Sequence, residues 1–334
     1  MEDVCLMDAP LRVLLVDDAV TYRKLVSDLL AQMPGIEVVG TAANGRIALG
    51  KCDQLHPDLL VLDLEMPELD GLGLLRRLRE SGKDVGAIVL SSPNTMDAKA
   101  TMAALELGAF DFVAKPNGGS LEENRRRLAS ELGARLQAFA RTHQVRRLLR
   151  QPASCRSAAS SPAPSCAESP VRACAAALAD MARARPEVVA LGISTGGPKA
   201  LSQMLPKLPK GLPVPVLLVQ HMPPVFTRSL AEDLDARCEL RVCEAADGQP
   251  VRPGCVYIAP GGQQMMVERR EGGVAVRITS DPPENSCRPS VDYLFRSVAE
   301  VWGGRAVGVI MTGMGSDGAK GCRLLKQRGH RNNV

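Results

Sequence analysis

Residues 188–198 read VVALGISTGGP, a short run of β-prone apolar residues that leads into a Gly-x-Ser-x-Gly turn. This order predicts a buried strand, a tight turn that carries Ser194, and a helix that begins near Pro198. Glycine tolerates backbone angles that other residues avoid, and the first amides of the helix would point at whatever lies over Ser194. The turn fits an activated serine with an anionic intermediate. It fits a phosphate or cofactor loop, or a plain strand-to-helix turn, equally well.

The composition indicates a globular chain with room for two domains. The 334 residues are 45% apolar but only 3% aromatic, so we expect aliphatic cores. A net charge of +4 and the few aromatic residues argue against a nucleic-acid partner. No run approaches about twenty apolar residues, and the N-terminus does not resemble a signal peptide. We therefore expect a cytoplasmic protein with no direct membrane insertion.

The ten cysteines contain no C-x-x-C pair and no Cys/His spacing typical of a zinc site. In the cytoplasm we expect them to be reduced thiols, and mostly packing residues.

Four strands are predicted in the N-terminal half, at residues 11–16, 59–62, 87–90 and 110–114, with amphipathic helical stretches between them. This alternation predicts a parallel doubly wound sheet, in which the carboxyl ends of the strands meet at one crevice. Crowded carboxylates there favour Mg²⁺, and one of them could attack a phosphoryl group. The polar residues at these strand ends are Asp17, Asp18, Asp63, Glu65, Ser91 and Lys115.

Over roughly residues 11–116, these motifs resemble the receiver domain of bacterial response regulators, a flavodoxin-like fold. The resemblance implies that Asp63 is the phosphoacceptor, that a histidine kinase is the phosphodonor, and that Phe112 is the switch aromatic residue. It implies Mg²⁺ ligands at Asp18, Asp63 and the Glu65 carbonyl, a water-mediated contact from Asp17, and support of the phosphorylation site by Ser91 and Lys115.

The middle of the chain has a different composition. Residues 121–150 are helical in pattern and rich in arginine, and residues 151–170 are rich in Pro, Ser and Ala. We expect a receiver domain at 10–128, a helical extension and linker at 129–185, and a second domain at 186–334. A DNA-binding output is the least favoured alternative, since helical arginine runs are usually solvated and no helix-turn-helix pattern follows.

Two further strands in the C-terminal half end in residues that could meet Ser194. His221 follows an apolar run at 214–219, and Asp317 follows one at 306–311. Alone, His221 is more often structural and Asp317 is more often a helix N-cap. Side by side, Asp317 could orient His221 while the other ring nitrogen takes the proton of Ser194. The amides of Thr195 and Met314 could stabilise an oxyanion.

The segments GISTGGP, QHM and TGMGSDGA resemble the catalytic domain of chemotaxis protein-glutamate methylesterases. The fold expected here is a doubly wound α/β domain with a β-hairpin insertion, because short strands flank Gly272-Gly273. The resemblance implies hydrolysis of methyl-glutamates on methyl-accepting chemoreceptors, often with deamidation of glutamines, without a cofactor for the esterase chemistry. It also implies that the unphosphorylated receiver blocks the active site and that phosphorylation relieves this block.

Relatives in this family continue beyond the point where the sequence ends at Val334, so we expect the catalytic domain to be C-terminally incomplete. The alternative hypothesis is therefore a catalytically impaired form that acts only as a phosphoacceptor or binding protein.

Overall fold

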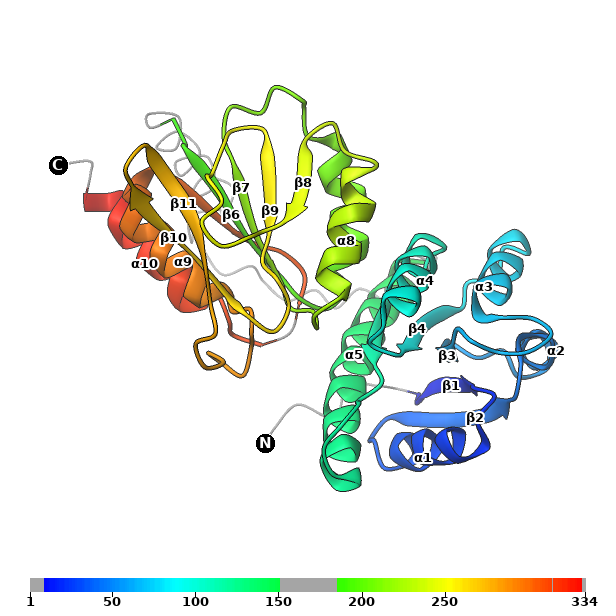
Figure 1. Ribbon diagram of the computed structural model, residues 1–334. Helices are drawn as coiled ribbons and strands as arrows, with labels where there is room; N and C mark the ends of the chain where they lie inside the picture. Colours follow the sequence, from blue (N-terminus) through cyan, green and yellow to red (C-terminus); the bar gives the residue numbers. More distant parts are fainter. Residues whose placement is uncertain (1–8, 151–184, 314, 332–334) are drawn as a thin grey trace, which may run out of the picture.

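The computed structural model describes residues 9–150, 185–313 and 315–331. Two α/β domains lie side by side, each with a central sheet (Figure 1). The expected Pro/Ser/Ala-rich linker and Met314 lie outside the described residues. None of the described helices is both long enough and apolar enough to cross a membrane.

The receiver sheet has five parallel strands in the order β2-β1-β3-β4-β5. This is the flavodoxin-like order, which confirms the predicted fold class. Strand β2 was not predicted from the sequence, because its residues include Gly40 and Thr41 and form no apolar run. Most of them are half-buried. The strands are β1 (Leu11–Val16), β2 (Ile36–Ala42), β3 (Leu59–Asp63), β4 (Gly86–Ser91) and β5 (Asp111–Ala114).

The helices of the receiver begin where side chains cap their first amides. Asn44, Asp70 and Asn94 each accept a hydrogen bond from the amide three residues later. The last helix is long, and its side chains from Leu128 to Ala140 pack into the receiver core. The helices are α1 (Val20–Ala31), α2 (Gly45–Leu55), α3 (Gly71–Glu80), α4 (Thr95–Glu106) and α5 (Leu121–Arg150).

The second domain also has a parallel sheet, in the order β12-β6-β7-β9-β8. The chain runs from β6 to β7 on one side and returns to β12 on the other side of β6. The strand order therefore reverses between β6 and β12, and ligand sites form at such a switch point. The strands are β6 (Val188–Ile193), β7 (Val216–Gln220), β8 (Arg241–Glu244), β9 (Cys255–Ile258) and β12 (Ala306–Ile310).

A β-hairpin projects from this domain, as predicted, with β10 (Gln264–Arg270) paired antiparallel to β11 (Gly273–Thr279). The sequence analysis did not predict the helix α8, which begins two residues after Pro224. The helices are α7 (Gly197–Met204), α8 (Phe226–Asp235), α9 (Val291–Trp302) and α10 (Ala319–Arg331), with short 3₁₀ turns at Leu205–Lys207 and Gly303–Arg305.

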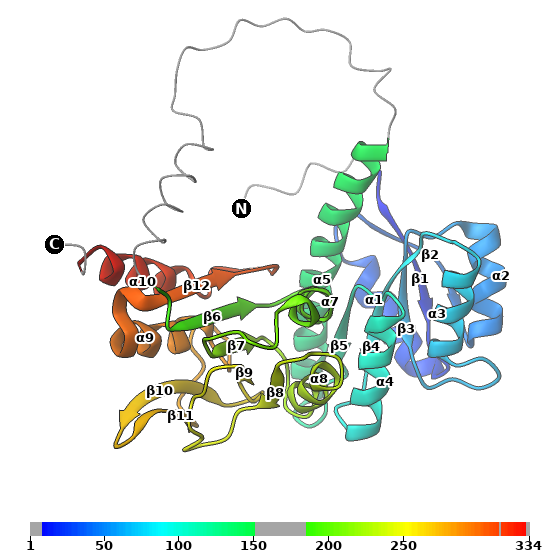
Figure 2. The same cartoon turned by 90° about the horizontal axis from the view of Figure 1, so that it is seen from above.

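The two domains share a packed interface, in which α7 and α8 face α4 and β5 (Figure 2). The rings of Phe112 and Phe226 lie 4.5 Å apart between centroids. Buried side chains from both domains, among them Met102 and Leu201, belong to one apolar cluster. The receiver therefore docks on the helix that begins directly after the Ser194 turn.

Candidate active site

Ser194 lies in a turn that is held from both neighbouring strands. Its amide donates to the Thr312 carbonyl at 2.9 Å, and Gln220 Nε2 donates to the Ser194 carbonyl at 2.9 Å. Gly196 has a φ of +73°, which favours glycine, and a Cβ on Gly197 would lie 1.8 Å from Gln220 Oε1. The glycines therefore allow a tight turn that presents the Ser194 hydroxyl at the carboxyl end of β6.

Ser194, His221 and Asp317 form a hydrogen-bonded chain. His221 Nδ1 lies 3.1 Å from Ser194 Oγ, and His221 Nε2 lies 2.8 Å from Asp317 Oδ2. A carboxylate can only accept, so Nε2 carries a proton, and in the neutral imidazole Nδ1 offers a lone pair to the serine. The ring is reversed relative to the chymotrypsin arrangement, in which Nε2 faces the serine.

Asp317 is held at the N-terminus of α9. It accepts hydrogen bonds from the Val291 amide at 2.7 Å, the Ser290 hydroxyl at 2.8 Å and Asn285 Nδ2 at 2.9 Å. Burial acts to raise the pKa of Asp317, but the hydrogen bonds from His221 and these donors outweigh it and hold the pKa well below its usual range. Asp317 is therefore an ionised, fixed partner for the imidazole.

Cys287 is a further neighbour of the imidazole. Its Sγ lies 3.8 Å from His221 Nδ1, and the thiol is half-buried. Burial acts to lower the pKa of His221, but the contacts with Asp317 and Cys287 outweigh it and raise the pKa to about 9. Cys287 was not predicted from the sequence, because it lies 66 residues from His221 and no local spacing joins them.

A hollow of about 70 Å³ lies beside the Ser194 hydroxyl, lined in part by His221, Thr312 and Gly313. A Cβ on Gly313 would lie 2.7 Å from Ser194 Cβ, so glycine is required there for the close approach. The Thr195 amide donates to no backbone acceptor among the described residues. Thr195 therefore remains a candidate donor to an oxyanion, and Met314 lies outside the described residues.

The acidic residues of the receiver also come together. Carboxylate oxygens of Asp17, Asp18 and Asp63 all lie within 4.8 Å of one another. Lys115 Nζ lies 2.7 Å from Asp63 Oδ2 and 3.7 Å from Asp17 Oδ2. Burial raises the pKa of Asp17 to about 6, against the opposing effect of Lys115, and its buried Oδ2 has no hydrogen-bond partner. This donor set and the unpartnered oxygen fit Mg²⁺.

Two predicted members of this site have other side-chain partners. The Ser91 hydroxyl accepts a hydrogen bond from Thr101 Oγ1 at 2.7 Å. The Glu65 carboxyl interacts with the side chain of Asp97, and this contact raises the pKa of Glu65. Tyr22, which the sequence analysis missed, places its ring centroid 4.9 Å from Lys115 Nζ.

A carboxylate of the receiver reaches the Ser194 turn. Asp111 Oδ2 accepts a hydrogen bond from the Gly196 amide at 3.0 Å, and Arg135 Nε lies 3.8 Å from the same oxygen. Burial raises the pKa of Asp111, and Arg135 opposes this effect. The start of α7 is therefore capped by the other domain.

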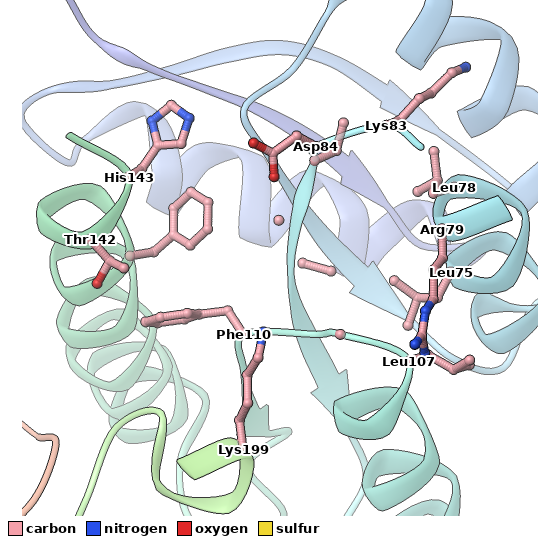
Figure 3. Close-up of a pocket in the computed structure, with 15 residues that line it drawn as sticks. Leu75, Leu78, Arg79, Lys83, Asp84, Leu107, Phe110, Thr142, His143 and Lys199 are labelled. Carbon is pink, nitrogen blue, oxygen red and sulfur yellow. The ribbon is translucent and has the colours of Figure 1, made fainter. Parts of the chain in front are cut away.

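A second hollow, of about 210 Å³, lies at the amino ends of β4 and β5 (Figure 3). Phe110 and Phe139 line it, and Lys199 extends into it from α7. It lies at the opposite edge of the receiver sheet from Asp63, which ends β3. This hollow is therefore an interdomain pocket and no part of the phosphoacceptor site.

A receiver fold with three clustered aspartates and a lysine, joined to an α/β domain with a Ser-His-Asp chain, defines a response regulator with a hydrolase as its output domain. The family models agree: the response regulator receiver domain matches residues 13–124, and the CheB methylesterase domain matches residues 189–334.

Known proteins match nearly the whole chain. A protein-glutamate methylesterase/protein-glutamine glutaminase from Desulfotalea psychrophila is 47% identical over 96% of this chain and 86% of its own length. A protein of the same name from Trichodesmium erythraeum is 41% identical over 95% of this chain and 86% of its own length. The crystal structure of the Thermotoga maritima CheB methylesterase catalytic domain is 44% identical over 43% of this chain and 76% of that chain, with a TM-score of 0.42. The chain belongs to the CheB methylesterase family, which is a family of carboxylic ester hydrolases.

Proposed function

We propose that this protein hydrolyses glutamate methyl esters on the cytoplasmic domains of methyl-accepting chemoreceptors and deamidates glutamines at related sites. The observation that carries the proposal is the hydrogen-bonded chain from Ser194 Oγ through His221 to Asp317 Oδ2. The names of its relatives support this choice of substrate. Such substrates place the protein in the cytoplasm.

In the first step, His221 Nδ1 takes the proton of Ser194 Oγ as the oxygen attacks the ester carbonyl. Asp317 accepts a hydrogen bond from the other ring nitrogen and stabilises the imidazolium that forms. The negative charge that develops on the carbonyl oxygen lies beside the first amides of α7, where Thr195 can donate.

In the second step, the imidazolium returns its proton to the departing methoxide, and methanol leaves. Water then attacks the acyl-serine with His221 again as the base, which restores Ser194 and leaves a glutamate carboxylate. For a glutamine side chain the same sequence releases ammonia. No step needs a cofactor.

The receiver supplies the phosphorylation site. We propose Asp63 as the phosphoacceptor, a histidine kinase as the phosphodonor, and Asp18, Asp63 and the Glu65 carbonyl as ligands of Mg²⁺, with Asp17 bound through water. Bound Mg²⁺ would neutralise charge on the phosphoryl oxygens. Lys115 can contact the same oxygens, and Ser91 can do so after its hydroxyl leaves Thr101.

The interface supports control of the esterase by the receiver. Phe112, which contacts Phe226, lies on β5 three residues before Lys115, which contacts Asp63. Phosphorylation that moves Lys115 would therefore also move Phe112 and the adjacent Asp111, which holds the Ser194 turn. We infer that phosphorylation loosens this contact and opens the active site.

The esterase is tested by measuring methanol release from methylated receptors. Ser194→Ala should reduce release to the uncatalysed level, whereas Ser202→Ala, a matched serine on α7, should retain it. Release from the wild-type protein no faster than from Ser194→Ala would refute the hydrolase and leave a phosphoacceptor or binding protein.

The receiver is tested separately by transfer of a labelled phosphoryl group from a histidine kinase. Asp63→Asn should lose the label, and Asp28→Asn, an exposed aspartate on α1, should keep it. Labelling that survives in Asp63→Asn would reject Asp63 as the phosphoacceptor without touching the proposal for Ser194.

A further inference from the structure

We propose that Cys287 and His221, with Ser194, form an inhibitory zinc site on the catalytic base. Only the expected effect of this metal site on esterase activity rests on the proposed roles of Ser194 and His221. Its ability to bind the metal follows from the geometry alone.

The distances from His221 Nδ1 to the other two atoms suit one tetrahedral ion. Zinc bonds to imidazole nitrogen at about 2.0 Å and to thiolate sulfur at about 2.3 Å, so a tetrahedral ion separates these two atoms by about 3.6 Å. His221 Nδ1 and Cys287 Sγ lie 3.8 Å apart. Ser194 Oγ lies 3.1 Å from the same nitrogen, close to the separation of about 3.3 Å for an oxygen ligand. A water molecule can complete the coordination from the adjacent hollow of about 70 Å³.

The surroundings of His221 match those of a zinc-bound histidine. Such a histidine usually donates its other ring N–H to a carboxylate, which fixes the tautomer and makes the ligating nitrogen more basic. His221 Nε2 lies 2.8 Å from Asp317 Oδ2, and four further donors hold Asp317 in place. His221 Nδ1 thus already faces Cys287 and Ser194.

The ligand types select a soft divalent cation. Thiolate and imidazole bind Zn²⁺ in preference to Mg²⁺, which prefers oxygen ligands. The acidic residues of the receiver offer oxygen atoms alone, so the two sites differ in the metal that they prefer.

Binding of zinc would stop the esterase by a defined route. The ion takes the lone pair of His221 Nδ1, which would otherwise accept the proton of Ser194. The thiol of Cys287 and the protonated imidazole of His221 each release one proton to solvent as Sγ and Nδ1 become ligands. Ester hydrolysis is therefore lost while zinc is bound, and it returns when a chelator removes the ion.

Binding is measured first, on the full chain with Mg²⁺ in excess to occupy the receiver. Isothermal titration with Zn²⁺, and the thiolate-to-metal charge-transfer absorption of bound Co²⁺, report the site without any substrate. We expect Cys287→Ser and Cys287→Ala to weaken zinc binding by at least about tenfold and to abolish the absorption. Cys238→Ser, a half-buried cysteine after α8, is the matched control and should change neither.

Inhibition is then measured as the ratio of methanol release with and without zinc in each protein, so that any effect of a substitution on the basal rate cancels. We expect wild-type and Cys238→Ser proteins to be inhibited reversibly, and Cys287→Ser to need at least about tenfold more zinc. Equal zinc affinity in wild-type and Cys287→Ser proteins would overturn the proposal, even if the esterase works as described. A protein that binds zinc through Cys287 but lacks esterase activity would support the metal site and refute the proposed function.

Discussion

The carboxylate of Asp111 lies across the domain interface against the amide of Gly196, with Oδ2 and N 3.0 Å apart. Gly196 is two residues beyond Ser194, at the start of α7. A negative charge there opposes the negative charge that develops on a substrate carbonyl oxygen. The contact therefore works against catalysis through charge as well as by holding the domains together.

Asp111→Asn should raise the basal esterase activity. The substitution keeps a hydrogen-bond acceptor for the Gly196 amide but removes the negative charge. Hydrogen bonds to charged groups contribute about 1.5–3 kcal/mol, so the contact becomes weaker. We expect kcat/KM for methanol release without a phosphodonor to rise about tenfold, which corresponds to about 1.4 kcal/mol. Glu80→Gln, which removes an exposed charge at the end of α3, is the control. Equal basal activity in the two variants would show that Asp111 does not restrain the site.

Gly197→Ala should impair the Ser194 turn. The added Cβ would lie 1.8 Å from Gln220 Oε1, so either the turn or Gln220 must move, and Gln220 holds the Ser194 carbonyl. A displacement near 1 Å can lower kcat by about 100-fold. Gly211→Ala is the matched control, because its Cβ would meet no atom within 4 Å. Steady-state methanol release from both variants tests this, and similar kcat values would contradict it.

The pH profile should reflect His221. Since the base acts in its neutral form and its pKa is raised to about 9, activity should rise through the neutral range and level off near that pH. Asp317→Asn removes a contact that raises this pKa, so the inflection should move to lower pH while kcat falls by about 10³–10⁴. An inflection near pH 6.5 in the wild-type protein would contradict the structure.

The same shift contributes to stability with a defined sign. His221 binds its proton more tightly in the folded state, so its contribution is fully present below pH 6.5, the ordinary pKa of histidine. It is lost as the pH rises through about 9. Urea unfolding of the wild-type protein and of His221→Gln across this pH range measures the contribution. The difference between their free energies of unfolding should shrink as the pH rises.

Asp17→Asn should stabilise the receiver in the absence of Mg²⁺. Burial raises the pKa of Asp17 from 3.8 to about 6, so the ionised carboxylate destabilises the fold above that pH. We expect the free energy of unfolding of Asp17→Asn to exceed that of the wild-type protein by about 2–3 kcal/mol at pH 8, and this gain should vanish below about pH 4. Urea unfolding in the presence of a chelator measures this gain, with Asp28→Asn as the control variant. A destabilised Asp17→Asn at pH 8 would contradict the account.

The sequence predicted the parts of the site that depend on parallel sheet topology. Ser194, His221 and Asp317 each follow an apolar run, and parallel strands end at one edge, so their meeting could be inferred. Asp17, Asp63 and Lys115 were found for the same reason. Strand β2 was missed because its residues form no apolar run. Helix α8 was missed although Phe226, Leu230 and Leu234 recur at helical spacing and are buried.

Contacts that depend on how separate segments fold against one another could not be predicted. Cys287 reaches His221 from the loop before α9, and Asp111 reaches Gly196 only because two domains dock. Ser91 was identified from its place at the end of an apolar run, but its bond to Thr101 depends on how α4 packs. Local spacing carries no information about any of these three contacts.

The apolar cluster that joins the domains has a consequence for how the protein responds in a cell. Both halves of the interface, including Phe112 and Phe226, belong to one polypeptide, so docking and release are intramolecular. The fraction of molecules with an accessible Ser194 is then independent of how much protein the cell makes. The balance between the docked and released domains is thus a property of each molecule, governed by the residues of this interface.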